Sequence, residues 1–243
     1  MLTINSVQVV NRLISGLPPI EYNHILGCCE QVELVLGSGL CEPNTPYQHV
    51  YFPLTGFISQ VTTMDSHQSL EMGLIGNEGM LGVTLVLGCN NAPMRGMVQG
   101  EGTCLRMTAN QLRREIRRSP LLHGILNHYL YVTMLQLGQL TACTHFHEVE
   151  QRLARFLLMA HDRAHSNYLY FTHHFLANVL GVRRSSVTVA AHALQEREII
   201  RYTRGEICVL DRHKLEESSC ACYNAEIDYY NQLLPVIEQQ LIV

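Results

Sequence analysis

Arginine residues gather in one part of the 243-residue chain. Residues 151–214 hold nine Arg and Lys214 against five acidic residues, a net charge of +5. The remaining seven basic and 16 acidic residues give the rest of the chain a net charge of −9. The planar guanidinium group of arginine donates paired hydrogen bonds to phosphates and to guanine edges. This asymmetry indicates an anionic partner for residues 151–214.

Histidine and cysteine residues offer metal-binding chemistry, but their spacing is loose. Four pairs lie close enough in the sequence to share an ion: His161 with His165, His145 with His147, His173 with His174, and Cys220 with Cys222. A structural zinc site needs four ligands, and no pair closes such a set. Adjacent Cys28 and Cys29, with Cys41, suit an iron–sulfur cluster poorly. The sequence therefore shows no clear iron–sulfur, haem or zinc site, and we assign no metal ligand and leave the cofactor unknown. We expect no disulfide framework, with most of the nine cysteines buried as free thiols.

The arginine-rich segment predicts two helices joined by a short turn. Thr172 can cap a helix over 173–180, and Gly181 permits a tight turn. A second helix then runs from about 183 to 196. Val187, Ala191 and Leu194 recur at helical spacing and face inward. Its N-terminal end carries arginine where the helix dipole and the free amides also favour phosphate.

A basic hairpin follows the second helix. Residues 199–202 and 207–210 are strand-like, with a turn at 203–205 between them. Arg201 and Arg204 lie near its tip. A helix-turn-helix followed by such a wing is typical of DNA-binding proteins, in which the second helix enters the major groove.

The remaining chain predicts a β-rich part and a long helix. Short strand-like runs separated by Gly, Pro, Asn and Asp fill residues 30–108, which favours a sandwich or roll. Residues 1–20 and 109–118 are expected to be short helices, and 148–164 another helix. A long helix over 120–145 carries an apolar stripe at steps of three or four: Leu122, Leu126, Tyr129, Thr133, Leu137 and Leu140. Its periodicity suits a core helix and a dimer seam equally.

The order of a β-rich part, a long apolar helix and the stretch LANVLGVRRSSVTVAAHALQ with a hairpin resembles the Crp/Fnr family of bacterial transcription regulators. The resemblance covers nearly all the chain to about residue 213 and implies an α+β fold. It implies a cyclic-nucleotide-binding-like, jelly-roll-like double-stranded β-helix over 1–118, a dimerisation helix over 119–147, a winged helix-turn-helix over 148–213 and a helical tail over 214–243. The stripe from Leu122 to Leu140 is then the dimer interface. The implied partners are double-stranded DNA, a second copy of the chain, RNA polymerase and a small-molecule effector in the β-roll.

The resemblance also assigns the DNA-binding residues. It places Arg184, Ser185 and Val189 at base-facing positions, and Arg183, Ser186 and Thr172 near phosphates. Thr188 lies on the same outward face of the second helix, and Arg201 and Arg204 lie on the wing. Ser185 and Val189 stand where the best-known members carry Glu and Arg, so their operator sequence is not carried over.

Residues 75–98 resemble the cassette that holds a cyclic nucleotide, with changes. The candidate effector residues are Gly76, Glu78, Gly79 and Arg95. An extra residue separates Gly76 from Glu78, and alignment on Val98 puts Met94 rather than Arg95 at the phosphate position. A one-residue shift along a strand turns a side chain to the opposite face. Cyclic-nucleotide binding is therefore doubtful, and the alternative function is a cyclic-nucleotide-binding signalling module that acts through protein contacts.

Composition and motifs exclude other classes. Hydrophobic residues make up 47% of the chain, enough for a packed core. No apolar run reaches the ~18 residues of a membrane-spanning helix, and the N-terminus lacks the pattern of a secretory signal. The chain also lacks a GxSxG, P-loop, GxGxxG or HExxH motif. We expect a cytoplasmic protein that is not an enzyme and has no membrane partner.

Overall fold

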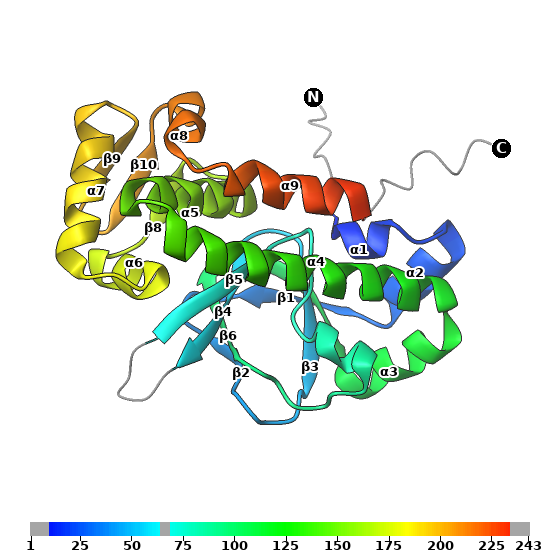
Figure 1. Cartoon of the computed structure of the whole chain (residues 1–243). Coiled ribbons are helices and arrows are strands. Elements are labelled where there is room, and N and C mark those ends of the chain that lie inside the picture. The colour runs from blue at the N-terminus through cyan, green and yellow to red at the C-terminus, as the bar shows by residue number, and fades with distance from the viewer. Residues whose placement is uncertain (1–9, 64–68, 234–243) are drawn as a thin grey trace, which may run out of the picture.

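The computed structural model describes residues 10–63 and 69–233, and these form an N-terminal β-roll and a C-terminal helical part (Figure 1). One sheet of the roll has the strand order β1 (Glu30–Leu34), β7 (Gly102–Thr108), β3 (His49–Pro53). The other has the order β2 (Gly39–Cys41), β6 (Arg95–Gly100), β4 (Phe57–Thr63), β5 (Ser69–Ile75). All described strand pairs are antiparallel. The expected β-roll is therefore confirmed.

Short helices close the roll. A 3-10 helix, η2, spans Val83–Leu87, and α3 spans Ala109–Arg118 as expected. The single helix expected over 1–20 is wrong: α1 covers only Arg12–Ser15, and a second helix, α2, runs over Pro19–Gly27. Pro19 begins a helix rather than ending one, because its fixed φ suits the first turn and its missing N–H leaves no donor unpaired there. Residues 1–9 of the expected helix lie outside the described residues.

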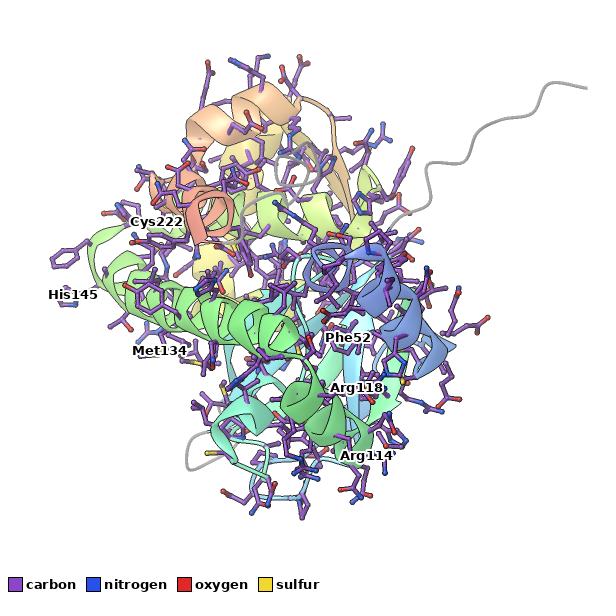
Figure 2. The ribbon with its side chains drawn as sticks, turned by 90° about the vertical axis from the view of Figure 1, so that its right-hand side faces the viewer. Phe52, Arg114, Arg118, Met134, His145 and Cys222 are labelled. Atoms are coloured by element: carbon purple, nitrogen blue, oxygen red, sulfur yellow. The ribbon has the colours of Figure 1, made fainter. Side chains whose placement is uncertain are left out.

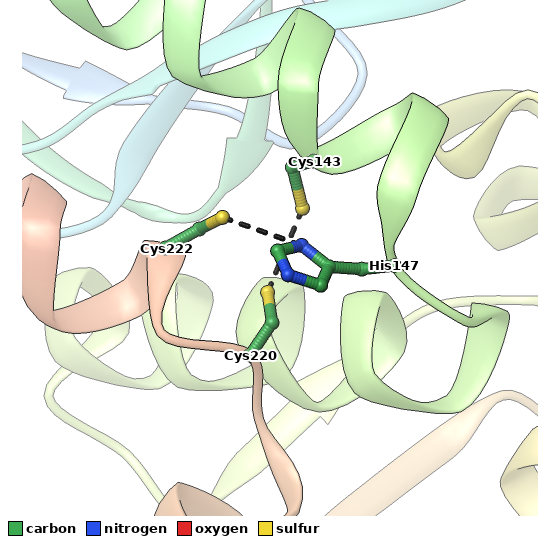
Figure 3. A group of neighbouring side chains, drawn as sticks. All are labelled: Cys143, His147, Cys220 and Cys222. Atoms are coloured by element: carbon green, nitrogen blue, oxygen red, sulfur yellow. Dashed lines mark hydrogen bonds between the residues drawn. The ribbon is translucent and has the colours of Figure 1, made fainter.

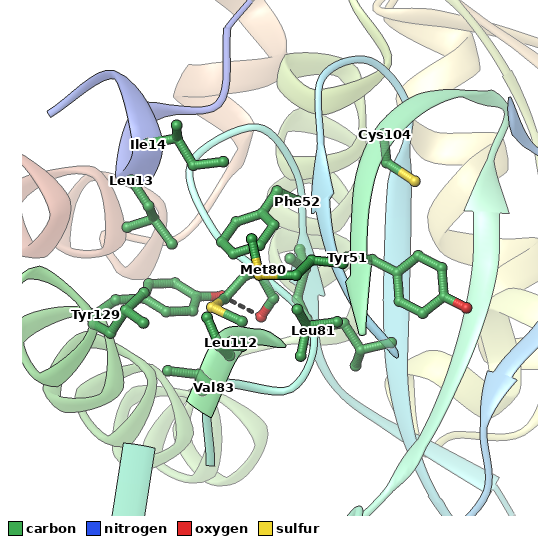
Figure 4. Packing of buried hydrophobic residues seen from close by; sticks show 14 of the residues in the cluster. Leu13, Ile14, Tyr51, Phe52, Met80, Leu81, Val83, Cys104, Leu112 and Tyr129 are labelled. Atoms are coloured by element: carbon green, nitrogen blue, oxygen red, sulfur yellow. Dashed lines mark hydrogen bonds between the residues drawn. The ribbon is translucent and has the colours of Figure 1, made fainter. Parts of the chain in front are cut away.

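The long helix α4 (Pro120–Phe146) lies along the roll and packs its apolar side into it. Leu122, Leu126 and Tyr129 are each at most 1% exposed and belong to the core of the roll. Figure 4 shows Tyr129 in this core with Leu13, Phe52 and Met80. The Tyr129 hydroxyl donates a hydrogen bond to the carbonyl oxygen of Met80. These three residues are therefore unavailable to a second chain, and the dimer interface predicted for them is wrong. The open side of the roll needs an apolar cover, and this side of the helix provides it.

The C-terminal part continues with α5 (Val149–Ala164), β8 (Tyr168–Tyr170), α6 (His173–Leu180), α7 (Arg184–Glu196), β9 (Ile200–Thr203) and β10 (Glu206–Val209). Two tail helices follow, α8 (Arg212–Ser218) and α9 (Cys222–Leu233), and α9 packs along α4 and α5. A second apolar core joins α5, α6 and α7 to Phe57 and Leu74 of the roll. Among the described residues, no helix is both long and apolar enough to cross a membrane.

Candidate DNA-binding surface

Helices α6 and α7 form a helix-turn-helix with a buried inner side. The Thr172 hydroxyl accepts a hydrogen bond from the Phe175 N–H at 3.1 Å and so caps α6. Gly181 ends α6 at φ 61°, a left-handed conformation that a side chain would resist. Val187 and Leu194, both 0% exposed, anchor α7 against α5 and α6. The Thr172 cap, the Gly181 turn and the buried side chains of α7 together fix the orientation of α7. The side of α7 opposite Val187 and Leu194 faces solvent.

The solvent side of α7 carries the residues expected to face bases. Arg184, Ser185, Thr188 and Val189 are all exposed, and Val189 is 71% exposed, an unusual state for an apolar side chain on a helix. Arg183 immediately precedes the helix as its N-cap residue and is also exposed, whereas Ser186 is half-buried. The first turn of α7 thus presents two guanidinium groups, a hydroxyl and free backbone amides to one region of solvent.

Strands β9 and β10 form the predicted wing, with β8 as a third strand beyond β10. Arg204 and Gly205 make the two-residue turn with φ values of 51° and 93°, the left-handed pair typical of a tight hairpin. The Gly205 carbonyl accepts a hydrogen bond from the Phe171 N–H at 2.8 Å, which holds the tip beside the start of α6. Arg204 therefore lies at the tip, whereas Arg201 is exposed within β9 itself.

Two residues that sequence reasoning missed connect these elements. The His173 ring stacks on Tyr202 of the wing with centroids 4.3 Å apart, and its Nδ1 lies 3.0 Å from the Thr188 hydroxyl on α7. Burial, and then the nearby Arg184 cation, lower the pKa of His173. The His173 ring thus joins α6, α7 and the wing. Residues 173 and 202 share no sequence periodicity, so only the folded chain relates them.

The structure divides the arginines of residues 151–214 into two groups. Arg155 and Arg163 are buried and ion-paired, Arg152 is buried and donates to the Leu180 carbonyl, and Arg197 and Arg212 form surface ion pairs. Within the part of the chain that is described, the other four form no ion pair: Arg183, Arg184, Arg201 and Arg204. The net charge of +5 therefore overstates the positive charge that residues 151–214 present at the surface. The arginines of this segment that form no ion pair with the described residues all lie on or beside the helix-turn-helix and the wing.

The four candidate effector residues do not form one pocket. Glu78 is buried and accepts hydrogen bonds from Arg163 Nε at 2.7 Å and from the Gly76 N–H at 3.0 Å. Arg95 pairs instead with Glu42 at 3.1 Å. Val98 of the same strand is 0% exposed, so Arg95, an odd number of residues away, faces outward. The predicted grouping of Arg95 with Glu78 is wrong in this structure.

Close packing explains why residues 76 and 79 are both glycine. An added Cβ at Gly76 would come within 2.6 Å of Arg163 Cγ, and one at Gly79 would overlap the Tyr129 hydroxyl. Arg163 of α5 also pairs with Glu226 of α9 at 3.2 Å. Glu78, one of the candidate effector residues, is thus paired with the chain's own arginine.

The structure also changes the assessment of metal-binding residues. Cys28 lies with His24 and Glu115, and Cys41 lies on β2. Cys28, Cys29 and Cys41, the cysteines considered for an iron–sulfur cluster, therefore do not form one group of ligands. Two of the sequence pairs contribute to a single cluster. It consists of Cys143, His147, Cys220 and Cys222, whereas His145 is exposed and lies outside it. The Cys143 thiol is hydrogen-bonded to Cys220, which lowers the pKa of Cys220 and raises the pKa of Cys143. The four side chains together have the type and number of ligands of a metal site, which none of the sequence pairs has alone.

Comparisons with known proteins agree with this geometry. Residues 151–218 match the model of the Crp-like helix-turn-helix domain. The structure is similar to FixK2 from Bradyrhizobium japonicum, with 13% identity and a TM-score of 0.67 over 79% of this chain and 98% of that one. It is also similar to a CRP/FNR-family transcriptional regulator from Thermus thermophilus, with 20% identity and a TM-score of 0.65 over 78% and 98% of the two chains.

A third similar structure is the c-di-GMP responsive global regulator CLP of Xanthomonas campestris, with 14% identity and a TM-score of 0.62 over 79% and 99% of the two chains. Comparison with curated protein sequences gave no match. At these identities the solved structures establish the fold alone, while the domain match establishes the helix-turn-helix.

Proposed function

We propose that this chain, whose fold is similar to that of solved Crp/Fnr regulators and which carries a Crp-like helix-turn-helix domain, is a homodimeric, sequence-specific DNA-binding transcription regulator. The observation that carries the proposal is the concentration of free cations. The four unpaired arginines of the C-terminal part surround α7 and the wing, although five others of the same segment are buried or paired.

The proposed contacts follow the geometry of the two elements. Arg184, Ser185 and Val189 would meet base edges in the major groove, with Arg184 donating two hydrogen bonds to guanine O6 and N7. Arg183, Ser186 and Thr172 would lie near phosphates, and Arg204 at the wing tip would meet the neighbouring backbone. Thr188 has a different role, since its hydroxyl is already engaged by His173 and by the Arg184 carbonyl. It orients α7 rather than reading a base.

A second copy of the chain would pack on the outer face of α4. This face comprises Tyr131, Met134, Gly138, Thr141 and His145, all exposed and spaced by three and four residues in turn. That heptad-like spacing suits a two-stranded helical seam. Met134 is 62% exposed and Tyr131 is 51% exposed, and Figure 2 shows Met134 on the outer side of the helix. The proposed interface therefore replaces Leu122, Leu126 and Tyr129 by residues about a third of a turn around the helix.

The proposal leaves cyclic-nucleotide signalling without support, because Glu78 and Arg95 are each committed to a different partner. In this proposal RNA polymerase is the partner through which the DNA-bound regulator would alter transcription. The division of the chain at residues 118, 147 and 213 remains a prediction. Helix α4 lies within the expected range 119–147, whereas the matched Crp-like domain, residues 151–218, extends past residue 213.

The proposal is tested by selecting binding sequences from random or genomic DNA and measuring isotherms on the selected operator and on random DNA. Arg184→Ala should reduce operator preference by about 1–3 kcal/mol per half-site. Arg201→Ala should weaken binding to both DNAs alike and lower the salt slope by about one, because one phosphate is no longer neutralised. Arg197→Ala is the control, since Arg197 lies just beyond α7 and pairs with Glu150. No selected sequence, or an unchanged ratio for Arg184→Ala, would contradict base reading by α7.

A further inference from the structure

Four metal-ligating side chains converge where α4 meets the tail. Cys143 lies in the last turn of α4 and His147 directly follows that helix, while Cys220 and Cys222 lie at the start of α9 (Figure 3). One ligand atom from each residue lies within 4.8 Å of all the others. The three cysteines are buried and His147 is half-buried, so the cluster is shielded but open to solvent on the histidine side.

The spacing of these atoms suits one ion. Cys143 Sγ and Cys220 Sγ are 3.6 Å apart, and Cys222 Sγ and His147 Nδ1 are 3.5 Å apart. A tetrahedral zinc ion, with Zn–S bonds of about 2.3 Å and Zn–N bonds of about 2.0 Å, separates its ligand atoms by about 3.5–3.8 Å. A disulfide would bring two sulfurs to about 2.05 Å. A four-iron cluster would hold its ligands further apart than a single ion does.

The surroundings suit the charge of such a site. Three thiolates and a neutral imidazole around Zn²⁺ carry a net charge of −1. Buried Arg152 and Arg155 both lie near enough to interact electrostatically with Cys143 and Cys220. Among the described residues, the buried Nε of Arg155 has no hydrogen-bond partner. The Gln139 amide donates to Cys222 Sγ at 2.9 Å, a contact that also orients a metal-bound thiolate.

We propose that Cys143, His147, Cys220 and Cys222 bind one structural Zn²⁺ ion through three sulfurs and the histidine Nδ1. Binding forms three Zn–S bonds and one Zn–N bond, and it releases the thiol protons to solvent without any change of oxidation state. Four protein ligands leave no open position, which makes the site structural rather than catalytic. Soft sulfur ligands in tetrahedral array select zinc over magnesium or calcium.

The ion would fasten the tail to the rest of the chain. Glu226 lies four residues after Cys222 on α9, and it pairs with Arg155 and Arg163 of α5. Gln136 of α4 also donates to Glu226 at 3.0 Å. A zinc ion bound by Cys222, the first residue of α9, would therefore hold α9 in place. This helix contacts α4 and α5 and, through Arg163, is linked to Glu78 of the roll.

The test begins with the full chain purified under reducing conditions with zinc present, followed by removal of free metal and elemental analysis. The expected content is about one zinc per chain, falling to a small fraction in Cys220→Ser and His147→Ala. Two matched variants should retain the metal: Cys208→Ser, at a buried cysteine outside the cluster, and His145→Ala, two residues from His147 and pointing away (Figure 2).

A second measurement covers variants that fold poorly. In the wild-type chain, zinc should slow the alkylation of Cys143, Cys220 and Cys222 beyond the protection that their burial gives, so a chelator should raise their labelling rate, while exposed Cys89 is labelled at the same rate in both cases. Cobalt added to the zinc-free protein should give the visible absorption of tetrahedral thiolate-bound Co²⁺. Wild-type protein without bound zinc, an equal zinc content in Cys220→Ser, a Cys143–Cys220 disulfide in reducing buffer, or iron at the site would each overturn the proposal.

Discussion

Replacing Arg163 by leucine tests whether the buried ion pairs at the centre of the molecule hold it together. Arg163 is 7% exposed and donates to Glu78 at 2.7 Å and to Glu226 at 3.2 Å. Glu226 keeps Arg155 at 3.0 Å when Arg163 is removed, but Glu78 keeps only the Gly76 N–H. Leaving one buried carboxylate without its cation typically costs about 3–5 kcal/mol, and we expect a loss of that size in the free energy of unfolding.

The assay is urea-induced unfolding followed by circular dichroism and tyrosine fluorescence, since the chain contains no tryptophan. Arg197→Ala is the matched control, because its pair with Glu150 lies at the surface with both side chains partly exposed, and surface pairs contribute about 0–1 kcal/mol. The double variant Arg163→Leu with Glu78→Gln should regain much of the lost stability, because it removes the unpaired charge. A loss in Arg163→Leu no larger than the control's would refute the reasoning. A double variant no more stable than Arg163→Leu would assign the loss to packing instead.

Three further predictions concern other parts of the molecule. Burial raises the pKa of Glu71 to about 7 from 4.5, so the stabilising contribution of its protonated form is complete below about pH 4.5 and is lost as the pH rises through 7. The stability of Glu71→Gln relative to wild type should therefore increase between pH 5 and pH 8, by up to about 3 kcal/mol in urea unfolding, and a difference that does not change with pH would contradict this. Gly79→Ala should cost about 1–3 kcal/mol in the same assay because of overlap with Tyr129, whereas Gly27→Ala, with open space around its Cβ, should not. Met134→Glu on the outer face of α4 should raise the dimer dissociation constant roughly 100-fold in light scattering, since two-fold symmetry counts the loss twice, while Met134→Leu should leave it near wild type.

Local sequence patterns determined most of the elements. The helices Ala109–Arg118 and His173–Leu180 begin and end where periodicity, caps and turn residues predicted. The helix-turn-helix was predictable for the same reason, because Thr172, Gly181 and the inward residues of α7 act within one short segment. Strand β2, only three residues long, carries too few residues to show an alternation and was missed.

Tertiary structure decided every feature that depends on which side of an element meets which neighbour. The apolar stripe of α4 has one period whether it covers a β-roll or a second helix, and only the packed chain shows that Leu122, Leu126 and Tyr129 cover the roll. The Gly76–Glu78 motif has the same letters whether its carboxylate meets a ligand or Arg163, 85 residues away. Cys143 and Cys220 are 77 residues apart, and their thiols meet because α9 folds back along α4. Contacts across such separations leave no periodic trace in the sequence, since they are set by the packing of whole helices and sheets rather than by neighbouring residues.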